Sequence, residues 1–161
     1  MTSQKPLSAS AQRVQEALRG AGIDTTITEY VVPARTSAEA AAVLRCSVGQ
    51  IAKSLVFRTL SGAPVLVIAS GANRVDEKRV GALIGERIGR ADADFVRAAT
   101  GYAIGGIPPL GHATAMTTLV DRDLLQYDVI YAAGGTPHAM FPVAPAELAR
   151  IANGQVADIR A

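Results

Sequence analysis

Residues 51–69 read IAKSLVFRTLSGAPVLVIA and contain two apolar runs separated by a short polar segment. The runs Lys53–Thr59 and Pro64–Ala69 are rich in aliphatic side chains, and the intervening Leu60-Ser61-Gly62-Ala63 is typical of a turn. We therefore predict an antiparallel hairpin, whose second strand is apolar throughout and is expected to be central in its sheet. Because a hairpin excludes an all-parallel sheet, the predicted fold class is α+β, with a mixed, curved, barrel-like sheet surrounded by helices.

Lys53 is an unexpected residue in the first of these strands. Burying an ammonium group costs several kcal/mol unless a partner or solvent compensates for the lost hydration. One interpretation is that Lys53 has a partner or a chemical task. The alternative is that its aliphatic stem covers apolar neighbours while the ammonium group reaches solvent.

The remaining chain alternates between helical and extended patterns. Helices are predicted from Ser8 or Ser10 to Arg19, from Thr36 or Ser37 to Leu44, after Ser47, from Asp76 to Ile84, from Asp92 to Ala99, and from Pro145 to Ile151. Strands are predicted at Thr25–Val32, closed by Pro33, and at Thr117–Val120, Val129–Ala132, Ala139–Val143 and Val156–Ile159. No repeat or linker interrupts the pattern, so residues 1–161 are predicted to form one domain, with residues 1–7 flexible.

A second informative segment is Thr100-Gly101-Tyr102-Ala103-Ile104-Gly105-Gly106-Ile107-Pro108-Pro109-Leu110-Gly111-His112. Its glycines permit positive φ and a close approach of a ligand to the main chain, whereas its prolines make the loop stiff. A rigid loop with exposed amides suits an anionic or carbonyl-bearing ligand. An ordinary tight turn between strands is the alternative.

Other candidate motifs carry less chemistry. Gly134-Gly135-Thr136-Pro137 lacks the spacing of a nucleotide-binding loop and reads equally well as a turn between strands or as a pocket wall. Most carboxylates fall at helix starts, where they stabilise the helix dipole. Asp121 and Asp123 flank Arg122 in a segment that is expected to be a surface turn.

Composition excludes several classes of function. The formal charge of +2 on 161 residues does not indicate a general nucleic-acid binder, although recognition of a single RNA end needs only a few basic groups. The single cysteine, Cys46, fits a reducing cytoplasm, and the histidine and cysteine spacing predicts neither a zinc site nor another cofactor. Residues 1–6 lack the apolar core of a signal peptide, and no apolar run is long enough to span a membrane.

Five segments together resemble the YbaK/prolyl-tRNA-synthetase-associated domain family, which contains free-standing aminoacyl-tRNA deacylases. They are Thr36–Ala41, Gln50–Phe57, Val65–Gly71, Thr100–Gly111 and Ala132–Thr136, and they occur in family order over nearly the whole chain. The resemblance implies the family fold, a barrel-like mixed sheet wrapped by helices. It also implies hydrolysis of the ester bond of a mischarged aminoacyl-tRNA, with the 3′ aminoacyl end as substrate and an aminoacyl-tRNA synthetase as a candidate partner, but no membrane or DNA.

The resemblance assigns Lys53 and the loop from Gly105 to Pro109 to the site, and the other site residues are expectations. Lys53 occupies the position of the family's essential lysine, and Gly105 and Gly106 belong to the loop that borders the aminoacyl pocket. The expected substrate-binding residues are Tyr30, Ser54, Phe57, Ile104, Pro109, Gly134, Gly135 and His138, of which Tyr30, Phe57, Ile104 and His138 read equally well as core. Members that clear cysteine resemble Lys-Thr-Leu and those that clear alanine resemble Lys-Asn-Leu, whereas this chain has Lys53-Ser54-Leu55. Some members carry an acidic residue on the strand after the second glycine turn, whereas this chain reads His138-Ala139-Met140-Phe141 there. Both differences leave the edited amino acid open.

An aminoacyl ester is already activated, so its hydrolysis mainly requires positioning, a water molecule and stabilisation of the developing oxyanion. We expect Lys53 to hold a phosphate or carbonyl group while glycine-loop main-chain groups orient the terminal adenosine and the water. Lys53 acting as a neutral base is the second interpretation. The alternative function is a module that binds an aminoacyl or nucleotide end without cleaving it, or that regulates a synthetase.

Overall fold

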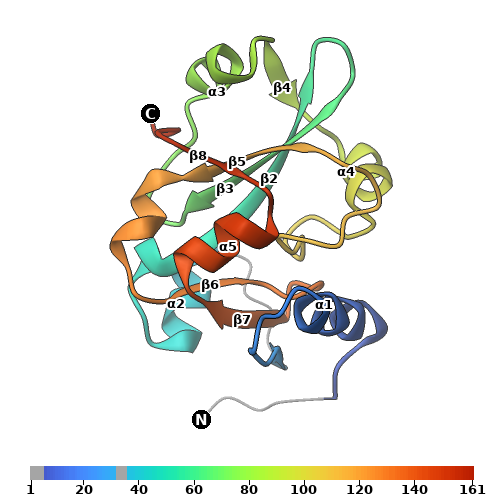
Figure 1. Ribbon diagram of the computed structural model, residues 1–161, viewed down its shortest axis with the longest axis vertical. Helices are drawn as coiled ribbons and strands as arrows, with labels where there is room; N and C mark the ends of the chain where they lie inside the picture. Colours follow the sequence, from blue (N-terminus) through green and yellow to red (C-terminus); the bar gives the residue numbers. More distant parts are fainter. Residues whose placement is uncertain (1–5, 32–35) are drawn as a thin grey trace.

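The hairpin predicted from residues 51–69 forms the centre of the fold in the computed structural model, which describes residues 6–31 and 36–161 (Figure 1). Strands β2 (Ile51–Thr59) and β3 (Pro64–Ser70) pair antiparallel, with Lys53 opposite Ala69. Gly62 takes a φ of 92° in the turn, a conformation that suits glycine. The hairpin prediction is therefore confirmed.

The other strands extend this hairpin on both sides into one mixed sheet. They are β1 (Thr28–Glu29), β4 (Ile88–Arg90), β5 (Thr117–Asp121), β6 (Ile130–Ala133), β7 (Ala139–Val143) and β8 (Gln155–Ala157). The strand order is β1-β7-β6-β2-β3-β5-β8, and β4 pairs with β2 off this path. The pairs β2–β6, β3–β5 and β5–β8 are parallel and the others antiparallel, which confirms the mixed sheet; its path is open between β1 and β8.

Side-chain alternation along β2 and β3 gives the sheet two apolar faces. Leu66 and Ile68 face the larger core, which includes residues of helices α1 (Ala9–Gly20), α4 (Ala93–Thr100) and α5 (Pro145–Ile151). Val65 and Val67 face a smaller core completed by Val80 of α3 (Glu77–Ile84). Figure 1 shows α3 and α5 on opposite sides of the central strands.

Four of the described α-helices begin directly after a predicted capping residue, and the last begins at Pro145 without a side-chain cap. The helices are α1 (Ala9–Gly20), α2 (Ser37–Leu44), α3 (Glu77–Ile84), α4 (Ala93–Thr100) and α5 (Pro145–Ile151), with 3₁₀ turns η1 (Val48–Gln50) and η2 (Arg122–Gln126). The hydroxyl of Thr36, for example, accepts the Glu39 N–H at 3.1 Å, as the capping-box spacing predicts. In the described part of the chain, no helix is both long and apolar enough to cross a bilayer.

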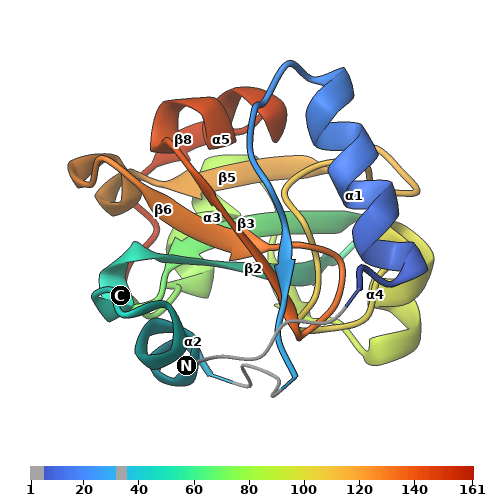
Figure 2. The same ribbon diagram turned by 90° about the horizontal axis from the view of Figure 1, so that it is seen from below.

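Three strand predictions require correction. The strand expected over Thr25–Val32 is reduced to β1, the short blue arrow in Figure 2. The main chain before β1 bonds instead to the Gln15 side chain, which donates to Thr25 O and accepts from Ile27 N, both at 2.9 Å. The last strand lies earlier than Val156–Ile159, at Gln155–Ala157, and β4 was not predicted. The expectations for Pro33 and for residues 1–5 of the flexible segment concern positions outside the described residues.

Asp121 is not the surface-turn residue that the sequence suggests. It is 1% exposed and its carboxylate accepts hydrogen bonds from the main-chain N–H groups of Ser70 and Asp123 and from the side-chain amide of Asn73, each at 2.9 Å. Ser70 is the last residue of β3 and Asp121 the last of β5. The Asp121 carboxylate therefore provides the hydrogen-bond acceptor for main-chain N–H groups at the point where these two strands end.

Candidate functional site

The most unusual feature of the sheet is a gap beside β2. Its pairing with β6 covers only Ile51 and Ala52, and its pairing with β4 begins at Phe57. Within the described residues, Lys53–Val56 therefore has a strand partner on the β3 side alone. A central strand thus has an open edge in the middle of the sheet.

The pattern of hydrogen bonds between β2 and β3 determines which peptide groups of β2 face this gap. At one end of β2, Ile51 O accepts from Gly71 N at 2.7 Å, and at the other end Thr59 N donates to Ala63 O at 2.8 Å. Because main-chain groups of successive residues point to opposite sides of a strand, the odd-numbered residues between these two bond to β3. The N–H and C=O of Ser54 therefore point into the gap.

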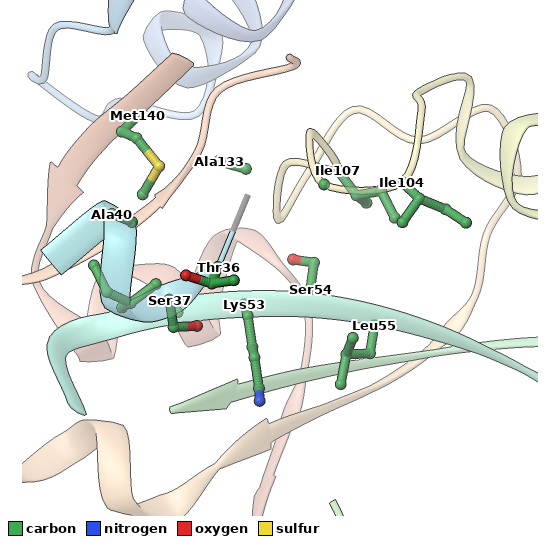
Figure 3. A pocket seen from close by; sticks show the side chains of 13 residues that line it. Thr36, Ser37, Ala40, Lys53, Ser54, Leu55, Ile104, Ile107, Ala133 and Met140 are labelled. Atoms are coloured by element: carbon green, nitrogen blue, oxygen red, sulfur yellow. The ribbon is translucent and has the colours of Figure 1, made fainter. Parts of the chain in front are cut away.

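A cavity of about 400 Å³ occupies the gap (Figure 3). Its walls come from α2, from β2, from β6 and β7, and from residues 100–112, which we name the glycine-proline loop. The lining residues are Thr36, Ser37, Ala40, Ile51, Ala52, Lys53, Ser54, Leu55, Ile104, Gly105, Ile107, Ala133 and Met140. Four of the predicted site residues, Lys53, Ser54, Ile104 and Gly105, are thus brought together.

Lys53 and Ser54 line the cavity from opposite faces of β2. Figure 3 shows the Ser54 hydroxyl on the side of Ile104 and Ile107, whereas the Lys53 ammonium group points to the other side, where Leu55 also lies. Among the described residues, no carboxylate lies within ion-pair distance of Lys53. Its half-buried charge is therefore available to an anionic or carbonyl group of a ligand.

The glycine-proline loop forms one wall of the cavity. Gly106 N donates to Ala103 O at 3.0 Å and Gly105 has a φ of 91°, the geometry of a turn that needs glycine at its third position. Tyr102, Ile107 and Leu110 belong to the large core, so the loop is anchored on both sides of the turn. The stiffness of this loop stays a prediction. The Gly106 N–H, however, is already used within the loop and cannot serve a ligand.

The second glycine segment, residues 134–137, is the turn between β6 and β7 and packs against the glycine-proline loop. A Cβ on Gly106 would lie 2.6 Å from Thr136 Cα, so the two loops touch through their main chains. Gly134 and Gly135 pack against Ile27 and the main chain of Ser10, respectively, and neither lines the cavity.

The other predicted residues lie elsewhere. Tyr30 borders a separate hollow of about 480 Å³, where burial raises its pKa, and His138 Nδ1 lies 3.0 Å from Tyr30 O. Phe57 packs against the small core on the far face of the sheet, and Pro109 is buried within the loop. None of these four residues lines the cavity.

Sequence reasoning missed the contribution of α2 and β7. Thr36 and Ser37 were assigned only to capping, although they also border the cavity, and Ala133 and Met140 carry no chemical signal of their own. Their position follows from the packing of α2 over Ile51, in a cluster that includes Met140. A sequence pattern does not encode this long-range arrangement.

The chemistry that the cavity offers is positional and electrostatic. Its 13 lining residues include hydroxyl groups, one ammonium group and an open peptide, but no carboxylate, histidine or cysteine. Nor do the described residues contain a cluster of such side chains suited to a metal ion. The site is therefore suited to a substrate that needs orientation and charge stabilisation more than a strong protein base.

Comparisons with known proteins show which family and structures the chain is similar to. A model of the aminoacyl-tRNA editing domain family matches residues 31–151. A crystal structure described as a "putative trans-editing enzyme for prolyl tRNA synthetase" is 44% identical, with a TM-score of 0.90, and the match covers 97% of this chain and 99% of that one. The structure of the hypothetical protein APE2540 is 32% identical, with a TM-score of 0.85 and coverage of 92% and 99%.

Two curated proteins are more distantly similar. The "Uncharacterized protein YwhH" of Bacillus subtilis (strain 168) is 27% identical over 133 residues, which are 83% of this chain and 85% of that protein. The "Putative Cys-tRNA(Pro)/Cys-tRNA(Cys) deacylase EbsC" of Enterococcus faecalis (strain ATCC 700802 / V583) is 29% identical over 112 residues, which are 69% and 68% of the two chains.

Proposed function

The chain belongs to the aminoacyl-tRNA editing domain family, and on this premise we propose that it is a trans-editing hydrolase of the prolyl-tRNA-editing type. Its substrate would be tRNA carrying the wrong amino acid, and its reaction the hydrolysis of the ester bond at the 3′ end. The similarity to a protein described as a "putative trans-editing enzyme for prolyl tRNA synthetase", and to one described as a "Putative Cys-tRNA(Pro)/Cys-tRNA(Cys) deacylase", supports this tRNA identity. A synthetase that makes the charging error would be the natural partner, in the cytoplasm.

The observation that carries the proposal is the open peptide of Ser54 at the floor of the cavity. When water attacks the ester carbonyl, negative charge develops on its oxygen, and a fixed main-chain N–H aimed at that oxygen stabilises it. The Ser54 N–H is fixed because β2 pairs with β3 along its whole length. The Ser54 C=O beside it can accept a hydrogen bond from the attacking water or the ribose.

Lys53 would position the substrate from the other side of the open edge. Its ammonium group suits the phosphate of the terminal nucleotide or the ester carbonyl, since a lysine acts on a phosphate as a compact point charge. Gly105 leaves the rim next to Ile104 free of a side chain, so the terminal adenosine can approach the main chain closely. Lys53 acting as a neutral base remains the second mechanistic possibility.

The proposal is tested with a panel of tRNAs charged with different radiolabelled amino acids. The expected result is multiple-turnover release of one or a few amino acids.

Lys53→Ala is expected to lower kcat/KM by roughly 10²–10³-fold, the range for losing one electrostatic contact to a transition state, with an unchanged circular dichroism spectrum. Lys78→Ala, at an exposed position of α3 away from the cavity, is the matched control and is expected to retain activity. Full activity of Lys53→Ala would rule out both roles of this lysine.

A binding module is the second candidate, because none of the lining residues is a carboxylate, histidine or cysteine that could serve as a base. The same panel separates the two functions. If charged tRNA binds but no amino acid is released, the chain recognises aminoacyl ends without cleaving them.

A further inference from the structure

Three arginines gather at the far end of the strand that carries Lys53. β4 pairs with the last residues of β2, with Phe57 opposite Arg90 and Arg58 opposite Gly89. Arg58, Arg87 and Arg90 line a shallow hollow of about 270 Å³ at this pairing, which we name the arginine groove. All three are exposed. Figure 1 shows β4 and the β2–β3 hairpin at one end of the molecule, with α2 near the other end of β2.

These arginines differ from the other arginines for which ion pairs are found. Arg79 and Arg122 bind Asp158, Arg150 binds Glu147, and Arg160 binds Asp123 and Asp158. In contrast, no carboxylate of the described residues lies within ion-pair distance of a guanidinium group of the arginine groove.

Two carboxylates close to the arginine groove in sequence, Glu86 and Asp92, are used by the main chain. Glu86 accepts the N–H of Ser61 at the hairpin turn. Hydrogen bonds from the side chain and from the main chain of Ser61 lower the pKa of Glu86. Asp92 accepts the N–H of Phe95 at the start of α4. The Phe95 ring lies 5.0 Å below the Arg58 guanidinium carbon, so Arg58 is held in place by a ring and not by an acid. Arg58 is therefore held in place without being neutralised, and no described carboxylate forms an ion pair with Arg87 or Arg90.

The arginine groove and the cavity lie along the same strand. Arg58 is the fourth residue after Ser54, which corresponds to about 13 Å along an extended strand. A single-stranded 3′ end bound in the cavity would cover such a distance with its last few nucleotides. Arginine binds phosphate with two parallel hydrogen bonds and also stacks on bases, which suits a short RNA strand.

We propose that the arginine groove binds the phosphates of the tRNA acceptor end immediately upstream of the terminal nucleotide held in the cavity. This inference rests on the proposed function, since it takes the cavity as the site of the aminoacyl end. It gives the chain an RNA-binding surface despite a formal charge of only +2. Sequence-independent phosphate contacts at this distance would fix the register of the 3′ end on the enzyme.

The test compares two triple variants with the same change in net charge. The first replaces Arg58, Arg87 and Arg90 by glutamine; the control replaces the ion-paired Arg79, Arg122 and Arg150 by glutamine. Each is measured for binding of uncharged tRNA for proline at several salt concentrations, and for hydrolysis of both charged tRNA and the corresponding 3′-O-aminoacyl adenosine. Thermal melting of each variant checks that the fold is intact.

The first variant is expected to bind tRNA on the order of tenfold to a hundredfold more weakly. The slope of log affinity against log salt should decrease by about 2, since each lost single-strand phosphate contact contributes about 0.7. Its loss of kcat/KM should affect charged tRNA and spare aminoacyl adenosine, which reaches only the cavity. The control variant should keep the wild-type salt slope.

Equal binding and an equal salt slope of the first variant and the wild type would overturn the inference. An equal loss in both triple variants would also overturn it, because it would show a general charge effect. If no ester is hydrolysed by the wild type but the arginine-dependent binding is found, the hydrolase proposal fails while the RNA-binding surface stands. If esters are hydrolysed and binding does not depend on these arginines, only the surface is wrong.

Discussion

At the scale of single residues, Gly106 shows how little space separates the two loops behind the cavity. Its φ is not positive, so glycine is required here for room and not for a special backbone conformation. A Cβ at this position would lie 2.6 to 2.8 Å from three main-chain atoms of Thr136. Main-chain atoms in a turn cannot rotate away as a side chain can, so the loops would have to separate.

Gly106→Ala is therefore expected to lower the free energy of unfolding by about 1–3 kcal/mol, as overpacking commonly does, and to reduce ester hydrolysis by displacing the cavity wall. Chemical denaturation and steady-state kinetics measure the two effects. Gly20→Ala is the matched control, because no atom lies within 4 Å of a Cβ at that helical position. A Gly106→Ala protein as stable and active as the wild type would show that the loop contact is not required.

At the scale of elements, β2 shows which features a sequence can predict. Its hairpin with β3 is local and follows from apolar runs around a turn, and Lys53 stands out because it interrupts such a run. The gap beside Ser54 is not local, since it depends on where β6 and β4 stop pairing with β2. For the same reason Phe57 was wrongly expected in the site: the gap ends where β4 begins to pair with β2 at Phe57, and the Phe57 ring packs in the core under α3. Asp121 was misread because its partners, Ser70 and Asn73, are distant in sequence.

Asp121→Asn tests how β3 and β5 are terminated. The carboxylate accepts three N–H groups, and an amide in its place would direct its own N–H groups toward at least one of these donors. We expect a loss of about 1–3 kcal/mol in the free energy of unfolding, the cost of an unsatisfied buried donor. Asp123→Asn, whose side chain is partly exposed, is expected to cost less in the same denaturation experiment. Equal stability of Asp121→Asn and the wild type would contradict this account.

At the scale of the whole molecule, the site is assembled from segments that the sequence keeps far apart. The cavity joins α2, β2, the glycine-proline loop and the ends of β6 and β7, which meet only because β2 pairs with β3 and β6 at once. The mixed α+β fold followed from local patterns. Local patterns did not predict which glycines line the cavity, since Gly134 and Gly135 pack against Ile27 and Ser10 outside it. Lys53, Ser54, Ile104 and Gly105 were expected in the site and do line the cavity, but their chemical roles still rest on the proposed function.

The stability of the whole fold is also expected to depend on His112, at the end of the glycine-proline loop. Burial lowers its pKa below the ordinary value of 6.5, against the opposing effect of the hydrogen bond between Nε2 and Pro108 O at 2.6 Å. The unfolded chain therefore binds this proton more readily than the folded one, so stability increases with pH in this range. The contribution of neutral His112 should be complete above pH 6.5 and lost as the pH falls through the lower folded value.

Urea denaturation of the wild type and of His112→Gln between pH 5 and 8 measures this contribution, because the other titrating groups are common to both proteins. Glutamine retains a donor for Pro108 O but carries no titrating ring. The difference in free energy of unfolding, wild type minus variant, is expected to be smaller at pH 5 than at pH 8. A difference that is constant with pH, or that grows as the pH falls, would show that folding does not disfavour the protonated ring. The loop would then have to bury a charged His112 at no cost in free energy.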